Sequence, residues 1–250
     1  MEVNISILSS KKRLEYVNGL NKTNCDYIHV DVMDGEFVPD KQFPVEEVKA
    51  IEYVSLKPLD VHLMVSDPEK YLKKLGKLER IEYVIFHIEC DVDIDRVIEK
   101  IRKLGYKVGI AISPKTDIKR LEEYLKKIDL VLVMSVEPGK GGQKFIESTT
   151  KRVRYLKKII NENKYKIVIE VDGGITNNTC KLVKDADRVV VGSYILKGSN
   201  CYEYQKYIDN VRLMREDKII KKNKKNNIIC MLLLIIIVVL LIVIIYMRLK

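Results

Sequence analysis

The feature that most constrains the fold is a regular alternation of short β-rich runs with longer amphipathic stretches. The amphipathic stretches are rich in Lys and Glu and carry apolar residues three or four positions apart, which is typical of surface helices. Strands that alternate with helices predict a parallel sheet, and eight such units in roughly 200 residues predict an α/β fold, the closed (β/α)8 TIM barrel. The eight runs are VNISIL (3–8), YIHVDV (27–32), LDVHLMV (59–65), YVIFHI (83–88), KVGIAI (107–112), LVLVMSV (130–136), KIVIEV (166–171) and RVVVGS (188–193).

A doubly wound open sheet is the alternative arrangement of the same elements. It would need a Gly-rich turn of the GxGxxG type after its first strand, where this chain reads SILSSKK. Helix starts are marked by polar caps, as at Ser66-Asp67-Pro68, where proline takes the first helical position. The helical segments include DPEKYLKKLGKL (67–78), DIDRVIEKIRKLG (93–105), DIKRLEEYLKKI (117–128) and ESTTKRVRYLKKIINEN (147–163).

The composition changes abruptly at residue 218. KIIKKNKKNN (218–227) is a basic, Asn-rich linker, and residues 228–247 follow without a charge. A helix of 20 residues is about 30 Å long, the thickness of the hydrocarbon core, so a single transmembrane helix is predicted after a barrel domain of residues 1–217. Lys and Arg before it predict a membrane-anchored barrel that faces the cytosol, with residues 248–250 beyond the bilayer. A barrel expressed without this segment would be cytoplasmic.

Charge and cysteine content argue against two classes of function. Seven basic residues and no acidic ones lie in residues 218–250, so most of the net charge of +10 belongs to that segment and the rest of the chain is close to neutral. A nucleic-acid partner is therefore not expected. The five cysteines are scattered, odd in number and without CxxC spacing, which indicates reduced thiols and neither a disulfide nor a zinc framework.

Ionisable side chains occur near the carboxyl ends of three predicted strands. Residues two apart in a strand face the same side, so His29 and Asp31 project together, and that side can be the interior mouth of the barrel. His62 and Asp172 lie toward the ends of two further strands. A lone strand histidine is more often a satisfied core residue, but three such strand ends together indicate a site. Two imidazoles and two carboxylates form a mixed N/O ligand set for one divalent ion: Zn²⁺, Fe²⁺, Mn²⁺ or Co²⁺.

This ligand set also suggests a reaction. A metal that holds a ketone oxygen and a neighbouring hydroxyl acidifies the carbon between them and stabilises the enediolate that forms on deprotonation. One of the two aspartates can remove the proton from one face of the carbon, and the other can return a proton to the opposite face. The expected result is epimerisation.

Glycine turns follow the last three predicted strands, where barrels often bind phosphate. Glycine lets backbone N–H groups approach an anion closely. The turns are VEPGKGGQ (136–143), DGG (172–174) and GS (192–193). The residues Met33, Met64 and Met134 each fall at or just past a strand end, where they form either an apolar lining over the substrate or plain core.

Six segments, in this order, resemble the signature segments of the ribulose-phosphate 3-epimerase family: SILS, HVDVMDGEFVP, DVHLMVSDPE, FHIE, VLVMSVEPGKGGQKF and EVDGGI. The resemblance covers about residues 3–215 and implies a metal-dependent barrel that interconverts ribulose 5-phosphate and xylulose 5-phosphate, in the pentose phosphate pathway, through a cis-enediolate. It implies Asp31 and Asp172 as the acid/base pair. The metal ligands it implies are His29, Asp31, His62 and Asp172. The substrate-binding positions it implies are Ser6, His62, Gly139, Lys140, Gly141, Gly142, Asp172, Gly173, Gly174, Gly192 and Ser193.

The chain departs from the family pattern at a few positions. Ile5 stands where proline is usual, Ser113 and Lys115 give SPKT where NPGT is usual, and Lys140 replaces an apolar residue of the phosphate loop. Lys140 either adds a cation near the phosphate or points to solvent, and we favour solvent. Asp34 lies off the face that His29 and Asp31 share, and we interpret it as a turn residue or a support behind the ligands.

Three functions remain in competition at this point. The first is an active epimerase for the pentose phosphate, tethered to a membrane through its C-terminal helix. The second is a related epimerase for a six-carbon ketose phosphate such as allulose 6-phosphate. The third is a catalytically silent barrel that serves as a membrane scaffold. A phosphorylated ketose is the expected partner of the first two, and homo-oligomers are compatible with all three.

Overall fold

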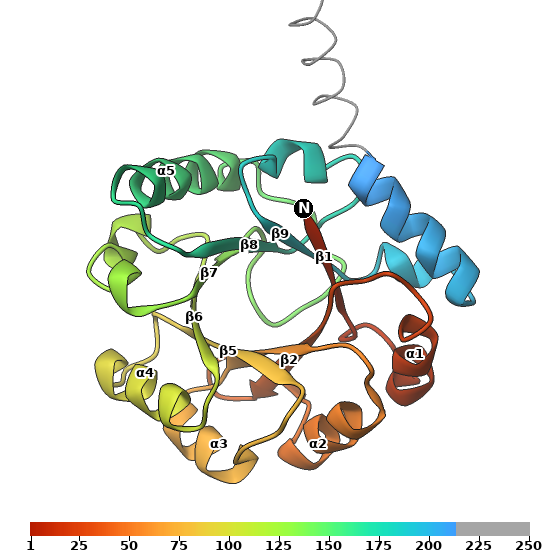
Figure 1. The fold of residues 1–250 in the computed structure, drawn as a ribbon, viewed down its shortest axis with the longest axis horizontal. Helices are drawn as coiled ribbons and strands as arrows, with labels where there is room; N and C mark the ends of the chain where they lie inside the picture. Colours follow the sequence, from red (N-terminus) through yellow and green to blue (C-terminus); the bar gives the residue numbers. More distant parts are fainter. Residues whose placement is uncertain (214–250) are drawn as a thin grey trace, which may run out of the picture.

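The computed structural model describes residues 1–213 and confirms the predicted TIM barrel. Eight parallel strands form a closed ring, because β1 pairs with β2 on one side and with β9 on the other (Figure 1). All eight predicted strands are present. Their bounds are β1 Glu2–Ser6, β2 Tyr27–Asp34, β4 Leu59–Met64, β5 Ile81–His87, β6 Lys107–Ile112, β7 Leu130–Met134, β8 Val168–Asp172 and β9 Arg188–Val191.

Helices cover the outside of the barrel (Figure 1). The α-helices are α1 Arg13–Leu20, α2 Val45–Val54, α3 Pro68–Leu75, α4 Ile94–Lys103 and α5 Thr149–Glu162, and residues 201–213 are also helical. Helix α3 begins as the sequence predicts, with Asp67 accepting a hydrogen bond from the backbone N–H of Lys70 and Pro68 in the first turn. Apolar residues of these helices, such as Val48 and Leu72, pack against the outward face of the strands.

The predicted α-helix over residues 117–128 is wrong. This segment forms two short 3₁₀ helices, η1 Ile118–Leu121 and η2 Leu125–Lys127. The apolar residues Ile118, Leu121 and Tyr124 are spaced by three, and side chains three apart eclipse in a 3₁₀ helix, so these turns bury Leu121 without a full α-helix. Two further 3₁₀ helices, η3 Cys180–Val183 and η4 Ile195–Lys197, follow β8 and β9.

Alternation along β2 determines which side chains enter the barrel. Ile28, Val30 and Val32 belong to the large apolar cluster between strands and helices, so His29 and Asp31 point inward. The strand register places Asp31 beside His62 of β4 and His29 beside Ser6 of β1. The inward direction and this register together bring polar residues of three strands to one place.

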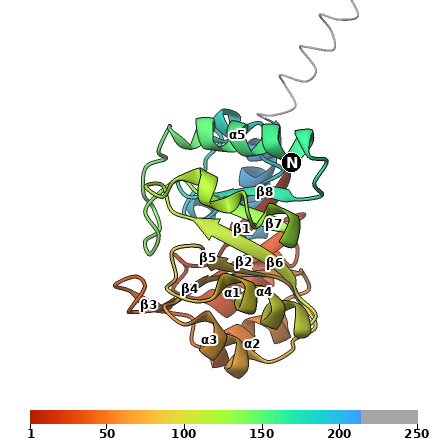
Figure 2. The same ribbon diagram turned by 90° about the vertical axis from the view of Figure 1, so that its left-hand side faces the viewer.

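Two extra segments extend from the end of the barrel where the strands finish. Strand β3, Lys41–Gln42, pairs antiparallel with the end of β2. Figure 2 shows this hairpin and the long segment between β7 and α5 protruding on the same side of the molecule. Both segments therefore border the carboxyl-terminal mouth of the barrel.

Among the helices of residues 1–213, none has the length and apolar character needed to cross a membrane. The described residues include most of the predicted barrel domain, residues 1–217. The predicted linker (218–227), transmembrane helix (228–247) and tail (248–250) lie outside them.

Candidate active site

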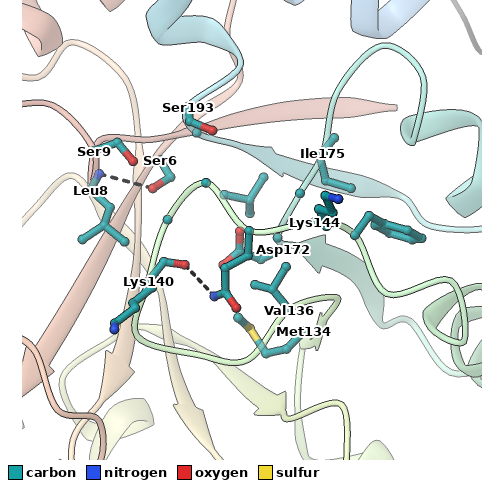
Figure 3. A pocket seen from close by; sticks show the side chains of 18 of the residues that line it. Ser6, Leu8, Ser9, Met134, Val136, Lys140, Lys144, Asp172, Ile175 and Ser193 are labelled. Atoms are coloured by element: carbon teal, nitrogen blue, oxygen red, sulfur yellow. Dashed lines mark hydrogen bonds between the residues drawn. The ribbon is translucent and has the colours of Figure 1, made fainter.

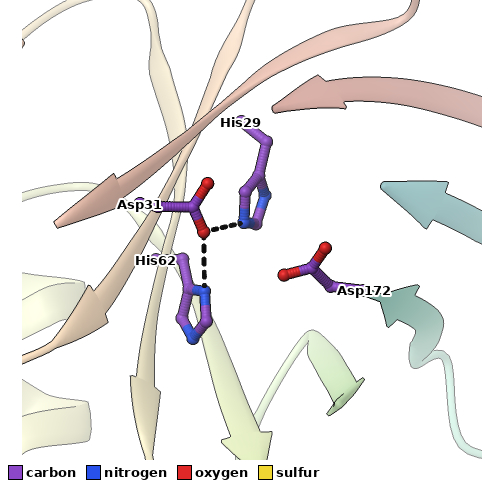
Figure 4. A group of neighbouring side chains, drawn as sticks. All are labelled: His29, Asp31, His62 and Asp172. Carbon is purple, nitrogen blue, oxygen red and sulfur yellow. Dashed lines mark hydrogen bonds and ion pairs between the residues drawn. The ribbon is translucent and has the colours of Figure 1, made fainter. Parts of the chain in front are cut away.

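The residues predicted to bind metal come together at the mouth of the barrel. One ligand atom each from His29, Asp31, His62 and Asp172 lies within 4.8 Å of all the others. They come from the ends of β2, β4 and β8, and Figure 4 shows the carboxylates of Asp31 and Asp172 facing each other across a gap. We call these four residues the mouth cluster.

Asp31 is the most heavily contacted member of the mouth cluster. Its Oδ1 atom lies 3.3 Å from His29 Nε2 and 3.3 Å from His62 Nδ1. Its Oδ2 atom accepts a hydrogen bond of 2.6 Å from the hydroxyl of Ser6. The side chain is only 3% exposed, so these contacts replace water around the carboxylate.

The two aspartates titrate in opposite directions. Burial alone would raise the pKa of Asp31, but the charge of His29 and its contact with the carboxylate hold that pKa well below its usual range. Burial and the negative charge of Asp31 raise the pKa of Asp172 to about 7. At neutral pH Asp31 is therefore a carboxylate, while Asp172 holds a proton for part of the time. Two carboxyl groups whose pKa values are separated in this way can act as a base and an acid in one reaction.

The two histidines also differ. Burial lowers the pKa of His62 to about 4, so its imidazole is neutral. Burial would lower the pKa of His29 as well, but the nearby carboxylates of Asp60 and Asp31 raise it well above the usual value. A cation in the mouth cluster would displace the proton from His29, because metal ligation needs a neutral ring.

The mouth cluster fits a divalent metal ion. It offers two imidazole nitrogens and two carboxylates, a donor set that suits Zn²⁺ and other first-row divalent ions. His29 Nε2 and His62 Nδ1 both face Asp31 Oδ1 at 3.3 Å, so a cation bound at this point would contact both rings and the carboxylate.

A second group of polar residues, which was not predicted from the sequence, lies deeper in the barrel. We call Asn4, Asp60 and Glu170 the inner cluster; all three are fully buried. The Asn4 amide donates to Asp60 Oδ2 at 2.8 Å and to Glu170 Oε1 at 2.7 Å. His29 links the two clusters, because its Nδ1 atom lies 2.8 Å from Asp60 Oδ1.

A cavity of about 460 Å³ opens above the mouth cluster. Asp31 and Asp172 line its floor, whereas His29 and His62 are fully buried beneath it. Figure 3 shows Asp172 and Met134 next to the loop that carries Lys140, with Ser6 and Ser193 in the upper part of the view. All the predicted substrate-binding positions except His62 line this cavity, and so do the three methionines: Ser6, Gly139, Lys140, Gly141, Gly142, Asp172, Gly173, Gly174, Gly192, Ser193, Met33, Met64 and Met134.

At two of these positions, neighbouring residues lie so close to the backbone that no side chain fits. Gly174 has φ +61, and a Cβ atom there would come within 2.5 Å of the backbone nitrogen of Phe145. Gly139 has φ +103, and a Cβ atom there would meet the side chain of Val38 at 2.9 Å. The loop after β7 is thus packed against the turn after β8 and against the segment that follows β2. Only glycine allows that packing at these two positions.

Matches to known proteins agree with this geometry. The model of the ribulose-phosphate 3 epimerase family matches residues 2–196. A chloroplastic ribulose-5-phosphate-3-epimerase of Arabidopsis thaliana is 39% identical over 212 residues, which cover 82% of this chain and 75% of that protein. A ribulose-phosphate 3-epimerase of Bacillus subtilis is 36% identical over 199 residues, which cover 78% of this chain and 90% of that protein.

The chain belongs to the ribulose-phosphate 3-epimerase family. Solved structures of lower identity share the fold of this epimerase-family chain. Tryptophan synthase subunit alpha from Campylobacter jejuni superposes with a TM-score of 0.58 at 19% identity and covers 84% of this chain and 94% of its own. Mycobacterium tuberculosis tryptophan synthase gives the same TM-score at 13% identity, covering 85% and 91%. These likenesses support the barrel fold and nothing beyond it.

The departures from the epimerase-family pattern lie outside the mouth cluster. Ile5 is fully buried in the main apolar core. Lys115 forms an ion pair of 3.0 Å with Glu137, and Lys140 is exposed on the rim of the cavity. Asp34 is a turn residue, because its carboxylate accepts hydrogen bonds from the backbone N–H groups of Glu36, Phe37 and Ser66.

One functional candidate of this epimerase-family site was missed in the sequence. His87, at the end of β5, is fully buried and its Nε2 atom lies 2.9 Å from His62 Nε2. His87 could have been predicted, because FHIE places an ionisable residue at a strand end, as do the three strands that supply the mouth cluster. Asp60 and Glu170 were also detectable, since they stand two residues before His62 and Asp172 and share their faces.

Proposed function

We propose that this chain is a metal-dependent epimerase that inverts C3 of D-ribulose 5-phosphate to give D-xylulose 5-phosphate. Membership of the family supports the reaction and the class of substrate. The observation that carries the proposal is the pair of aspartates that line the floor of one cavity with their carboxylates facing each other. An inversion needs one group that can accept a proton and another that can supply one.

The roles of the two aspartates follow from their electrostatics. Asp31, the carboxylate, takes the proton from C3 of the ketose and becomes a carboxylic acid. Asp172, when protonated, delivers its proton to the opposite face of C3 and becomes a carboxylate. The electron pair left on C3 is held meanwhile as an enediolate over C2 and C3. The reverse reaction starts from the protonation state that the forward reaction leaves behind, so no other proton carrier is needed in either direction.

The metal ligands in this proposal are His29, Asp31, His62 and Asp172. A divalent cation held there, Zn²⁺, Fe²⁺, Mn²⁺ or Co²⁺, supplies positive charge beside the oxygens on which negative charge develops. Ser6 holds the Asp31 carboxylate in place through its 2.6 Å hydrogen bond. Met33, Met64 and Met134 line the cavity with apolar surface and limit the access of water to C3.

The phosphate group is assigned to the glycine turns. The glycines of these turns line the cavity together with Ser193, in the segments that follow β7, β8 and β9: Gly141, Gly142, Gly173, Gly174 and Gly192. Backbone N–H groups in such turns bind anions. Lys140 is exposed and lines the cavity, and in this proposal it adds positive charge near the phosphate.

The proposal is tested by assaying the purified chain with ribulose 5-phosphate in a coupled assay for xylulose 5-phosphate. Turnover should disappear on chelation and return when Zn²⁺, Fe²⁺, Mn²⁺ or Co²⁺ is added back. In D₂O the product should carry deuterium at C3, because the proton that Asp172 delivers exchanges with solvent. Turnover without deuterium at C3 would contradict the two-aspartate mechanism.

The alternatives give different results in the same assay. A six-carbon epimerase would turn over allulose 6-phosphate faster than ribulose 5-phosphate. A silent scaffold would turn over neither. The mouth cluster argues against the scaffold, because the structure brings one possible ligand atom from each of its four side chains within 4.8 Å of the others.

For the cell, we propose that residues 228–247 anchor the barrel to a membrane with the barrel on the cytosolic side. Twenty uncharged residues after a basic linker support this proposal. Extraction of membranes with carbonate tests it: an anchored protein stays in the pellet, and recovery in the supernatant would contradict the anchor.

A further inference from the structure

A chain of hydrogen-bonding groups extends from His62 away from the cavity, along the end of β5. His62 Nε2 lies 2.9 Å from His87 Nε2, and His87 Nδ1 lies 2.9 Å from Glu89 Oε2. The other Glu89 oxygen accepts a hydrogen bond of 2.8 Å from the backbone N–H of Ser113. His62 and His87 are fully buried, and their rings stack with centroids 5.0 Å apart. Neither His87 nor Glu89 belongs to the mouth cluster.

The charge of Glu89 determines which groups in this series donate and which accept. Burial would raise the pKa of Glu89, but the hydrogen bonds from His87 and its other neighbours lower it to about 2, so Glu89 is a carboxylate and can only accept. His87 Nδ1 must therefore donate. In a neutral imidazole with a donating Nδ1, the Nε2 atom is an acceptor. When His62 binds a cation through Nδ1, its Nε2 atom carries the hydrogen, and His87 Nε2, 2.9 Å away, is the acceptor in reach.

This order of donors leaves His62 Nδ1 with a lone pair. That lone pair faces Asp31 Oδ1 at 3.3 Å, and two electron-rich atoms at this distance repel each other unless a cation lies between them. The arrangement that satisfies Glu89 and His87 is thus the one that prepares His62 to bind a cation through Nδ1.

We propose that His87 and Glu89 are positioning residues that fix the tautomer of His62 for metal binding. The proposal rests on the metal site of the proposed function, and it assigns to two residues outside that site the task of turning the His62 lone pair toward it. Partners of this kind orient metal-binding histidines, and their loss usually weakens metal binding about 10- to 100-fold. Without His87, the His62 Nε2–H would be buried without an acceptor, and the ring would be free to adopt the other tautomer.

Metal affinity tests the proposal in a matched set of variants. His87→Leu removes the acceptor, whereas His87→Gln keeps an amide oxygen that can accept from His62. Glu89→Leu removes the carboxylate from a side chain that is 20% exposed, so it is the variant that disturbs the core least. The control is Glu82→Gln, on the same strand, where the carboxylate is paired with Lys107 at 2.7 Å and contacts no histidine.

Zn²⁺ dissociation constants of the metal-free proteins would be measured by competition with a chromophoric chelator. We expect His87→Leu and Glu89→Leu to bind Zn²⁺ about 10- to 100-fold more weakly, His87→Gln to recover part of that loss, and the control to match the wild type. Equal thermal stability of wild type and Glu89→Leu in the absence of metal would show that the loss is not one of folding.

Ring nitrogen NMR gives a second readout that a purely structural role would not move. The chain has three histidines, so ¹⁵N-histidine labelling gives a simple spectrum. In the Zn²⁺-loaded wild type, His62 Nε2 should resonate as a protonated nitrogen, and in metal-free Glu89→Leu both His62 tautomers should be present. A wild type that binds no Zn²⁺ would defeat the proposed function itself. A wild type that binds Zn²⁺ while both leucine variants bind it equally well would overturn the role of His87 and Glu89 alone.

Discussion

The mouth cluster and the inner cluster are both buried groups of polar side chains, and they meet at His29. The mouth cluster holds four possible ligand atoms within 4.8 Å of one another, and Asp60 and Glu170 of the inner cluster form a second such group when His29 is counted with them. They differ in what lies next to them. Asp31 and Asp172 of the mouth cluster line a cavity of about 460 Å³, while Asp60 and Glu170 are fully enclosed.

The difference shows how the two clusters compensate buried charge. In the inner cluster the Asn4 amide donates to both carboxylates, and burial together with the charge of Asp60 raises the pKa of Glu170 well above its usual value, so one negative charge is removed by protonation. In the mouth cluster Asp31 stays ionised beside His29, and Asp31 and Asp172 line the cavity. A fully enclosed group can only support its neighbours, whereas carboxylates that line a cavity can take up a cation and a substrate.

The largest effect is expected from the mouth-cluster aspartates. Asp172→Asn and Asp31→Asn each remove a proton-transfer group, so kcat should fall about 10²- to 10⁴-fold in a barrel that still folds. Steady-state kinetics at saturating metal would measure it, with circular dichroism as the check on folding. Near-normal turnover in either variant would rule out the acid/base roles.

A smaller effect on kcat is expected from a change in the inner cluster. Asp60→Asn weakens the contact that orients His29 from behind, so Zn²⁺ should bind about tenfold more weakly. Once metal is saturating, kcat should fall far less than in Asp172→Asn, because Asp60 does not line the cavity. A loss of kcat as large as that of Asp172→Asn would contradict the claim that the inner cluster only supports the metal ligands.

Ser6→Ala tests the support of Asp31 within the mouth cluster. Removing the hydroxyl that donates to Asp31 Oδ2 should lower kcat/KM about 2- to 10-fold, the range expected for one net hydrogen bond. Ser10→Ala is the matched control, because the Ser10 hydroxyl accepts only from the backbone N–H of Lys12 and is not part of the cavity wall. Equal kinetics for the two variants would show that Asp31 does not depend on Ser6.

The smallest effect, on stability alone, is expected from Glu170→Gln. Because the pKa of Glu170 is raised in the fold, the folded protein binds more protons than the unfolded chain above the unfolded pKa of about 4.3, and stability falls as pH rises. Gln does not titrate, so in metal-free protein the Tm of the variant relative to wild type should be a few degrees higher at pH 8 than at pH 5. A Tm difference that is the same at both pH values would show that Glu170 is not protonated in the fold.

The barrel and the members of the mouth cluster could be predicted from the sequence, because both follow from the regular spacing of apolar and polar residues along strands and helices. Alternation within β2 is enough to place His29 and Asp31 on one face, and a parallel barrel gathers its strand ends at one mouth. The contact between His62 and His87 depends on ring orientation across two neighbouring strands, which no period encodes. The 3₁₀ turns of residues 117–128 were missed for a related reason, since a spacing of three suits both kinds of helix.

Anomalous diffraction from crystals of the Zn²⁺-loaded protein, recorded at the zinc absorption edge, tests the central comparison most directly. We expect one peak, between the side chains of the mouth cluster, and none at the inner cluster. A peak between Asp60 and Glu170, or the absence of a peak at the mouth cluster in protein shown to contain zinc, would contradict this expectation.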